Sequence, residues 1–230
     1  ILITNPRDMK KFCADLKKNP FSIITGVNTL FIGLLNQDVF KSLDFSQLKM
    51  ALGGGMAVQD AVAKEWEELT DSPLLEAYGL SETSPAVTIN PVDGTHKMGS
   101  IGLPLPNTDI KIFDDDRKEV PQGEPGEIGI KGPQVMKAYW NRPEETANSM
   151  HGEYFLTGDV GVMDEDGFFK IVDRKKEMVL ISGFNVYPNE IEDVVASHDK
   201  VLEVAAVGIP DDKSGEVVKI FVVKKDKSLK

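Results

Sequence analysis

The sequence contains very little cysteine: Cys13 is the only one among 230 residues. A single thiol excludes an internal disulfide and suits a reducing compartment. Cys13 lies between Phe12 and Leu16 in a helical pattern. That position favours a small core residue over a reactive nucleophile.

Basic residues are too few to balance the acidic ones. Lys and Arg number 26 and Asp and Glu number 37, so the formal net charge is −11 at pH 7. Such a charge disfavours a nucleic acid or an anionic membrane as a partner, because long-range electrostatic forces repel both. We therefore expect no nucleic-acid partner, and any anion that binds must be held by local donors.

Long apolar runs are missing as well. The least charged stretch, residues 20–37, is interrupted by Ser, Thr, Gly and Asn and is too short to span a bilayer. No secretion-signal pattern and no internal repeat is found. The chain starts with ILITNPRD, without an initiator Met, and stops just after a strand-like apolar run. We therefore expect it to be part of a longer protein.

What the first ninety residues do contain is an alternation of helix and strand signals. Helices are expected at 4–19, 28–40 and 57–69, and strands at 21–26, 49–55 and 73–79. Asn5 is a candidate N-cap for the first helix, with Pro6 as its first helical residue. Such alternation predicts an α/β fold in which helices cover parallel strands.

From about Gly99 the pattern changes to short alternating strands separated by turn residues. The dipeptide Asp166-Gly167 is a strong hairpin signal. This stretch predicts a small barrel or a curled antiparallel sheet. After Arg174 a third unit is expected, with a strand, a helix that starts at Pro188 and two further strands.

The loop YGLSETSP, residues 78–85, follows a predicted strand. Tyr78 can cover a face of an aromatic base, and Ser81 can donate to a phosphate oxygen. A carboxylate beside phosphate, here Glu82, is costly unless a cation lies between them, which suggests Mg²⁺. The alternative is a plain turn punctuated by Gly79 and Pro85, with Glu82 as a solvated charge.

Three further stretches carry weaker signals. In LGGGM, residues 52–56, three glycines let the backbone lie flat against a planar group, although a plain turn is the simpler interpretation. Asp159 in YFLTGDVG can accept hydrogen bonds from ribose hydroxyls, or it can be a hairpin-turn residue. The cluster DRKKE, residues 173–177, is either a surface charge cluster or a hinge between domains.

Together these segments resemble the adenylate-forming superfamily of acyl-CoA synthetases, luciferases and peptide-synthetase adenylation domains. YGLSE resembles the family's YGxTE motif, with Ser81 in place of Thr. GEPGEIGIKGPQVMKAYW, YFLTGDVG and DRKKEMVLISGFNVYPNEIE match further family motifs in the expected order. The segments NPFSIITGVNTLFIGLLN and LDFSQLKMALGGGMAVQ look most like bacterial long-chain fatty acid–CoA ligases.

The resemblance implies a domain organisation. Residues 1–97 would be the α/β portion of a large adenylating domain, and 98–173 a distorted antiparallel β-barrel subdomain. Residues 174–176 would form a hinge, and 177–230 the start of a small α+β C-terminal domain.

The resemblance also implies an ATP-dependent, AMP-forming acid–thiol ligase. A long-chain fatty acid would react with ATP and Mg²⁺ to give an acyl-adenylate, and CoA would then displace AMP. The alternatives are an aryl or medium-chain CoA ligase, an adenylation domain that loads a carrier protein, and a non-catalytic acyl-adenylate binding module. The implied location is cytoplasmic, with peripheral contact at the inner membrane, and the oligomeric state stays open.

Roles for individual residues follow from the matched motifs. Ser81 would touch the α-phosphate, and Glu82 would hold Mg²⁺. Lys176 would be the pivot of a domain rotation, and Gly183 would line the channel for the pantetheine arm of CoA. The residues implied to bind the nucleotide are Gly54, Gly55, Met56, Tyr78 and Gly79 for adenine, and Asp159 and Arg174 for ribose.

Two expectations concern the substrate and the missing motifs. Val27, Leu30 and Phe31 are candidates for the acyl pocket, although an apolar stripe on a helix is more often core. The family's Ser/Thr/Gly-rich phosphate loop and its Gly-Lys catalytic lysine have no counterpart in this sequence. We therefore expect these 230 residues, taken alone, to lack ligase activity.

Overall fold

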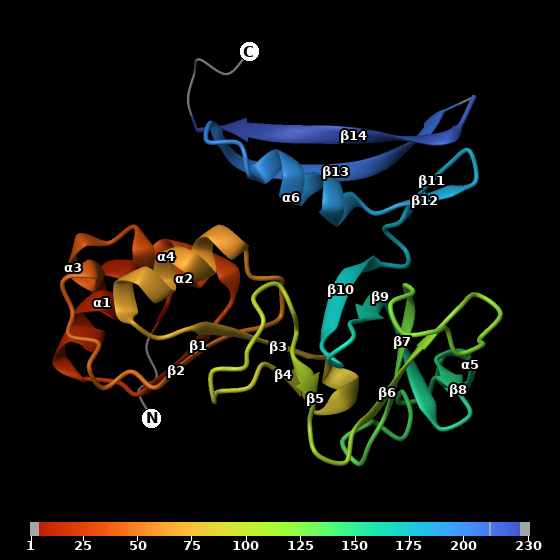
Figure 1. The fold of residues 1–230 in the computed structure, drawn as a ribbon, viewed down its shortest axis with the longest axis horizontal. Coiled ribbons are helices and arrows are strands. Elements are labelled where there is room, and N and C mark those ends of the chain that lie inside the picture. Colours follow the sequence, from red (N-terminus) through yellow and green to blue (C-terminus); the bar gives the residue numbers. More distant parts are fainter. Residues whose placement is uncertain (1–4, 212, 226–230) are drawn as a thin grey trace. The chain divides into compact units, whose positions relative to one another are not determined.

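The computed structural model describes residues 5–211 and 213–225. Figure 1 shows the elements in chain order. The helices and the short 3₁₀ turn are α1 (Met9–Lys18), α2 (Asn28–Leu35), α3 (Asp38–Lys41), α4 (Asp60–Thr70), η1 (Ser81–Thr83), α5 (Pro143–Asn148) and α6 (Pro188–Ala196). The strands are β1 (Ile23–Gly26), β2 (Met50–Gly53), β3 (Leu74–Gly79), β4 (Ala86–Ile89), β5 (Leu103–Pro104), β6 (Asp109–Phe113), β7 (Gly126–Lys131), β8 (Met150–His151), β9 (Tyr154–Met163), β10 (Phe169–Arg174), β11 (Val179–Ile181), β12 (Phe184–Val186), β13 (Val201–Asp211) and β14 (Gly215–Lys224).

The first sheet has the order β1-β2-β3-β4-β5. Its first three strands are parallel, with Gly26 opposite Gly53 and Gly53 opposite Glu76, whereas β4 and β5 join antiparallel. The alternation of helix and strand signals therefore predicted the parallel arrangement correctly, and the α/β fold class is confirmed. Because parallel strands end on the same side, the loops after β1, β2 and β3 share one edge of the sheet.

A compact aromatic core supports this sheet. Phe31, Phe40 and Trp66 are each 0% exposed. The Phe31 ring meets the Trp66 ring edge-on, with 5.0 Å between their centres, a favoured geometry for aromatic pairs. Cys13 belongs to the same core, and burial raises the pKa of its thiol. The interpretation of Cys13 as a core residue is confirmed.

The sequence misplaced the start of the first helix. Helix α1 begins at Met9, and its N-cap is Asp8, whose side chain accepts a hydrogen bond from the Lys11 amide. Asn5 instead accepts from the Arg7 amide in the preceding turn. Both are good capping residue types, so composition alone does not choose between them.

The helix expected over 28–40 is divided in two. Helix α2 ends at Leu35, and α3 starts at Asp38. The Asn36 side chain donates to the Ile32 carbonyl at 2.9 Å, which satisfies a carbonyl at the end of α2. A local side-chain bond of this kind competes with continued helix, because it offers the backbone another partner.

The second sheet has the order β10-β9-β7-β6, and β8 pairs with β9. Strands β7 and β9 are antiparallel. The turn predicted at Asp166-Gly167 is present between β9 and β10, and Gly167 has a φ of 84°. The third sheet has the order β12-β11-β14-β13. Strands β13 and β14 form a long antiparallel ribbon with α6 beside it (Figure 1), and α6 begins at Pro188 as expected.

The chain forms two compact units. One comprises residues 1–109, 132–139 and 167–169, and the other 110–131, 140–166 and 170–230. The site residues expected between Val27 and Glu82 lie in the first unit, and Asp159, Arg174, Lys176 and Gly183 lie in the second. In the ranges covered by the structure, every helix is too short or too polar to cross a membrane.

Candidate functional site

The loops after β1 and β2 lie against each other at the carboxyl edge of the first sheet. The Gly54 amide donates to the Gly26 carbonyl at 3.1 Å. A Cβ built on Gly55 would lie 3.7 Å from the Val27 side chain. The structure thus brings together residues that the resemblance links to adenine and to the acyl chain.

Two buried polar side chains hold the far end of the LGGGM loop. Glu76 accepts a hydrogen bond from the Val58 amide at 3.2 Å, and Asn28 accepts from the Gln59 amide at 3.2 Å. Glu76 and Asn28 are 8% and 7% exposed. Met56 itself is 63% exposed. The loop backbone is therefore fastened by neighbouring elements, and sequence reasoning missed both fasteners because they come from β3 and α2.

The YGLSETSP loop closes on itself around Thr83, which is 0% exposed. The Thr83 hydroxyl accepts from the Leu80 amide at 3.0 Å and donates to the Pro85 carbonyl. At Gly79 a Cβ would overlap the Pro85 carbonyl oxygen. Only glycine permits that approach. The loop is thus a tightly specified turn, with Ser81 exposed on it.

Glu82 is held by a segment more than fifty residues away in the sequence. The Met136 amide donates to the Glu82 carbonyl at 2.7 Å, and the Tyr139 hydroxyl donates to Glu82 Oε1 at 2.8 Å. Burial, together with the Glu82 carboxylate, raises the pKa of Tyr139 to about 12. Glu82 is half-buried and hydrogen-bonded, which is not the state of a freely solvated loop charge.

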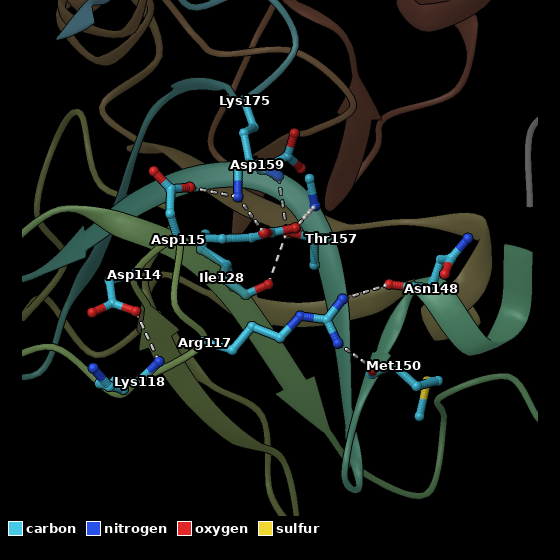
Figure 2. Close-up of polar contacts among 12 residues, drawn as sticks. Asp114, Asp115, Arg117, Lys118, Ile128, Asn148, Met150, Thr157, Asp159 and Lys175 are labelled. Atoms are coloured by element: carbon cyan, nitrogen blue, oxygen red, sulfur yellow. Dashed lines mark hydrogen bonds and ion pairs between the residues drawn. The ribbon is translucent and has the colours of Figure 1, made fainter. Parts of the chain in front are cut away.

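The two ribose candidates are neighbours in the second unit. Arg174 Nε lies 3.6 Å from Asp159 Oδ1. The Asp159 side chain is 12% exposed and that of Arg174 is 58% exposed. The Asp159 amide donates to the Thr157 hydroxyl, which donates in turn to the Ile128 carbonyl (Figure 2). Asp159 is therefore set in an ordered strand rather than in a free turn.

A charge network lies beside Asp159. Lys175 Nζ lies 2.9 Å from Asp115 Oδ1 (Figure 2). It also lies 3.1 Å from Glu127 Oε2. Glu127 also accepts from the Gly158 amide at 3.0 Å, and the Lys175 amide donates to the Gly158 carbonyl at 2.9 Å. The hydrogen bond to Asp115 is the main cause of a raised pKa at Lys175. The network thus fixes the residue that precedes Asp159.

The hinge and channel candidates occupy exposed turns. Lys176 is exposed in the turn between β10 and β11, which the Glu177 amide closes on the Arg174 carbonyl at 2.9 Å. Gly183 has a φ of 86°, and a Cβ built there meets no atom within 4 Å. In this structure the backbone conformation alone accounts for glycine at 183. The pivot and channel roles stay predictions.

The acyl-pocket candidates differ in their surroundings. Phe31 packs on Trp66 in the core, Leu30 lies partly buried against that core, and Val27 is 39% exposed. Phe31 thus occupies the core position that was the alternative interpretation. Whether any of the three contacts an acyl chain stays a prediction.

The donor set for a metal is small. Over residues 5–211 and 213–225, no group of three or more His, Cys, Asp and Glu side chains is arranged to hold a metal ion. A cation at Glu82 would therefore need ligands from elsewhere. Mg²⁺ suits such a site, because it is commonly held by one or two carboxylates together with substrate phosphates.

Known proteins match the chain along its whole length. A long-chain-fatty-acid–CoA ligase of Yersinia pestis is 58% identical over 229 residues, which cover 100% of this chain and 41% of that protein. A protein of the same name from Escherichia coli O6:H1 is 59% identical over the same coverage. The chain thus spans about two fifths of the length of these relatives.

Solved structures agree with the fold. ATP-bound MatB from Rhodopseudomonas palustris superposes with a TM-score of 0.88 at 34% identity, covering 98% of this chain and 44% of that one. Models of two families also match: the AMP-binding enzyme family over residues 1–140, and the AMP-binding enzyme C-terminal domain over residues 190–230. The chain therefore belongs to the AMP-binding enzyme family.

Proposed function

We propose that the protein to which these residues belong is a long-chain fatty acid–CoA ligase. In the first step a carboxylate oxygen of the fatty acid attacks the α-phosphorus of ATP, and pyrophosphate leaves. In the second step the thiolate sulfur of CoA attacks the acyl carbon of the adenylate, and AMP leaves. The products are acyl-CoA, AMP and pyrophosphate.

The observation that carries this proposal is the 58–59% identity, over the whole chain, to two proteins named as such ligases. The identity includes both units of the fold, and therefore both groups of site candidates. The fastened loops at the edge of the parallel sheet support it independently, because such edges are where open α/β sheets bind nucleotides.

The first unit would bind adenine and phosphate. The Gly54–Met56 backbone and the Tyr78 ring would enclose the base, and the exposed Ser81 hydroxyl would donate to the α-phosphate. Glu82 would supply a carboxylate to Mg²⁺, which when bound neutralises phosphate charge. Oxygen is the donor that this cation prefers, so the residues present fit it.

The second unit would bind ribose and admit CoA. Asp159 would accept hydrogen bonds from the ribose hydroxyls, and Arg174 would support it from 3.6 Å. Lys176 would be the pivot between the two steps, and Gly183 would face the pantetheine arm. A cytoplasmic location and contact with the inner membrane accompany this proposal as expectations.

The proposal is tested on the complete protein whose coding sequence contains this chain. Purified protein is incubated with ATP, Mg²⁺, CoA and an equimolar mixture of octanoate, palmitate, oleate, benzoate and ferulate, and the acyl-CoA products are quantified by mass spectrometry. We expect palmitoyl-CoA and oleoyl-CoA to dominate, with one AMP released per thioester. A matched Glu82→Gln protein controls for contaminating ligases.

Each other result has a definite meaning. Benzoyl-CoA or feruloyl-CoA as the main product would replace the long-chain assignment with an aryl ligase. Adenylate formed without any CoA thioester would point to a carrier-loading domain. Absence of both products would contradict the proposed ligase.

A further inference from the structure

The carboxylate of Glu82 is the one protein group proposed above to meet the cation, yet it stands on a short surface turn. A glutamate side chain has three rotatable bonds, and fixing a long side chain in one rotamer costs conformational entropy. A metal ligand placed there is effective only when something else holds it in position. The segment 132–139 provides contacts of the required kind.

That segment contacts the turn at two points and the residue after the turn at a third. The Met136 amide donates to the Glu82 backbone carbonyl at 2.7 Å, and the Tyr139 hydroxyl donates to Glu82 Oε1 at 2.8 Å. Gln134 Nε2 donates to the Ala86 carbonyl at 3.2 Å, just beyond the turn. One stretch of chain thus fixes both the backbone and the carboxylate of Glu82.

The segment is itself anchored. Gln134 Nε2 also donates to the Thr108 hydroxyl at 2.8 Å, and the Val135 amide donates to the Gly132 carbonyl at 3.2 Å. Tyr139 is half-buried in the same segment. The hydrogen bond to Glu82 is therefore made by a residue of an anchored stretch of chain.

The Tyr139 hydroxyl donates to only one of the two carboxylate oxygens of Glu82. Across the residues that the structure describes, Glu82 Oε1 receives the Tyr139 hydroxyl, whereas no side-chain or backbone donor is found for Oε2. Groups that hydrogen-bond to a metal ligand orient it, and their loss typically lowers metal affinity by about 10- to 100-fold. A hydroxyl that donates to Oε1 leaves Oε2 for a cation.

We propose that Tyr139 is a positioning residue for Glu82: its hydroxyl fixes the carboxylate so that the second oxygen meets the divalent cation that accompanies the nucleotide. This inference rests on the proposed function. It assigns a role to a residue of the loop after β7 that acts through Glu82 and does not itself touch the nucleotide.

The test compares Tyr139→Phe, which removes only the hydroxyl, with wild type in the complete protein. Mn²⁺ replaces Mg²⁺ as the probe, together with α,β-methylene-ATP, from which pyrophosphate cannot leave. Enhancement of water proton relaxation reports the protein-bound Mn²⁺. We expect Tyr139→Phe to raise the Mn²⁺ concentration at half-saturation about tenfold. Tyr154→Phe, which removes a phenol hydroxyl outside the site, serves as the matched control and should leave it unchanged.

Two further measurements distinguish a positioning role of Tyr139 from a general loss of structure in the variant. Metal-free AMP should bind Tyr139→Phe and wild type equally, because AMP alone does not need the cation. In a Glu82→Gln background, adding Tyr139→Phe should raise the half-saturation concentration by less than twofold, since Tyr139 acts through the Glu82 carboxylate. Two results would overturn the proposal: a tenfold loss of metal-free AMP affinity in Tyr139→Phe, or a tenfold rise in the Mn²⁺ concentration at half-saturation when Tyr139→Phe is added to Glu82→Gln.

A second measurement avoids dependence on the folding of the variant. Site-specific 3-fluorotyrosine at position 139 keeps the ring and the hydroxyl, and its ¹⁹F resonance should shift when diamagnetic Mg²⁺ is withdrawn from the nucleotide complex. The shift should vanish in Glu82→Gln. An unmoved resonance in wild type contradicts the inference. Failure of the proposed function is seen separately, as absence of acyl-CoA from every acid tested.

Discussion

The first sheet and the third sheet bury their apolar side chains to very different degrees. Around β1, β2 and β3, the residues Phe31, Phe40 and Trp66 are fully buried. On the β13–β14 ribbon, Phe221 is 52% exposed and Val223 is 47% exposed. The first region thus gains most from the hydrophobic effect, which scales with the apolar area removed from water.

The same contrast extends to the site candidates. In the first region Glu82 is tied to one distant segment by the Tyr139 hydroxyl and the Met136 amide, and Thr83 closes its loop from a fully buried position. In the C-terminal region Lys176 and Gly183 stand in exposed turns whose backbone sets their positions. The first group is therefore held by tertiary contacts, whereas the second is held by the local conformation of its turns.

Truncating a core side chain should show the difference in burial between the two sheets most clearly. Trp66→Ala removes the largest fully buried side chain and should lower the free energy of unfolding by about 3–5 kcal/mol. Phe221→Ala, at a half-exposed position, should cost less than about 1 kcal/mol. Urea unfolding followed by circular dichroism measures both. Equal losses would show that the ribbon is better packed in solution than its exposure indicates.

Thr83→Val should cause the next largest loss in the free energy of unfolding. It keeps the shape of the side chain but removes the hydroxyl that bonds Leu80 and Pro85. Losing the hydrogen bonds of a fully buried hydroxyl should lower the free energy of unfolding by about 1–3 kcal/mol. Thr25→Val, on the exposed side of β1, is the control. Its free energy of unfolding should stay within about 0.5 kcal/mol of the wild-type value. If the two variants melt at the same temperature, Thr83 does not hold the turn.

Asp159→Ala should weaken nucleotide binding in the second unit. Loss of a charged hydrogen-bond acceptor should raise the dissociation constant for a non-hydrolysable long-chain acyl-sulfamoyl adenosine about tenfold or more. Calorimetric titration measures it, with the exposed Asp116→Ala as control. If Asp159→Ala and Asp116→Ala bind the acyl-sulfamoyl adenosine with the same affinity, Asp159 does not contribute to nucleotide binding.

Lys175→Met should change the free energy of unfolding only slightly, the smallest effect of the four, because the Lys175 side chain is 40% exposed and solvent screens its ion pairs. We expect a loss of about 1 kcal/mol or less near neutral pH. The pKa of Lys175 is raised in the folded state, so the stabilisation is fully present below pH 10.5, its ordinary value, and is lost as the pH rises through the folded pKa. Thermal melts at pH 8 and pH 11.5 should therefore show the difference between wild type and variant shrinking at the higher pH. A difference that is independent of pH and of salt would assign the effect to packing.

Much of this fold was predictable from local patterns. The alternation of apolar segments with turn residues located β1, β2 and β3 and their parallel order, and Asp166-Gly167 marked its hairpin correctly. The exact start of α1 and the break before α3 were not predictable. Asn5 and Asp8 are both good caps, and the bond from Asn36 to Ile32 depends on the packed helix.

The family and the candidate residues could be predicted from the amino-acid sequence, because glycines, hydroxyl residues and carboxylates occur at fixed spacings within single loops. The contacts that hold those candidates in place became visible in the folded chain. Glu76 fastens Val58 from a neighbouring strand, and Tyr139 reaches Glu82 across 57 residues. Such contacts leave no periodic trace in the chain, since the physical requirement is proximity in space and a matching donor and acceptor, not spacing along the backbone.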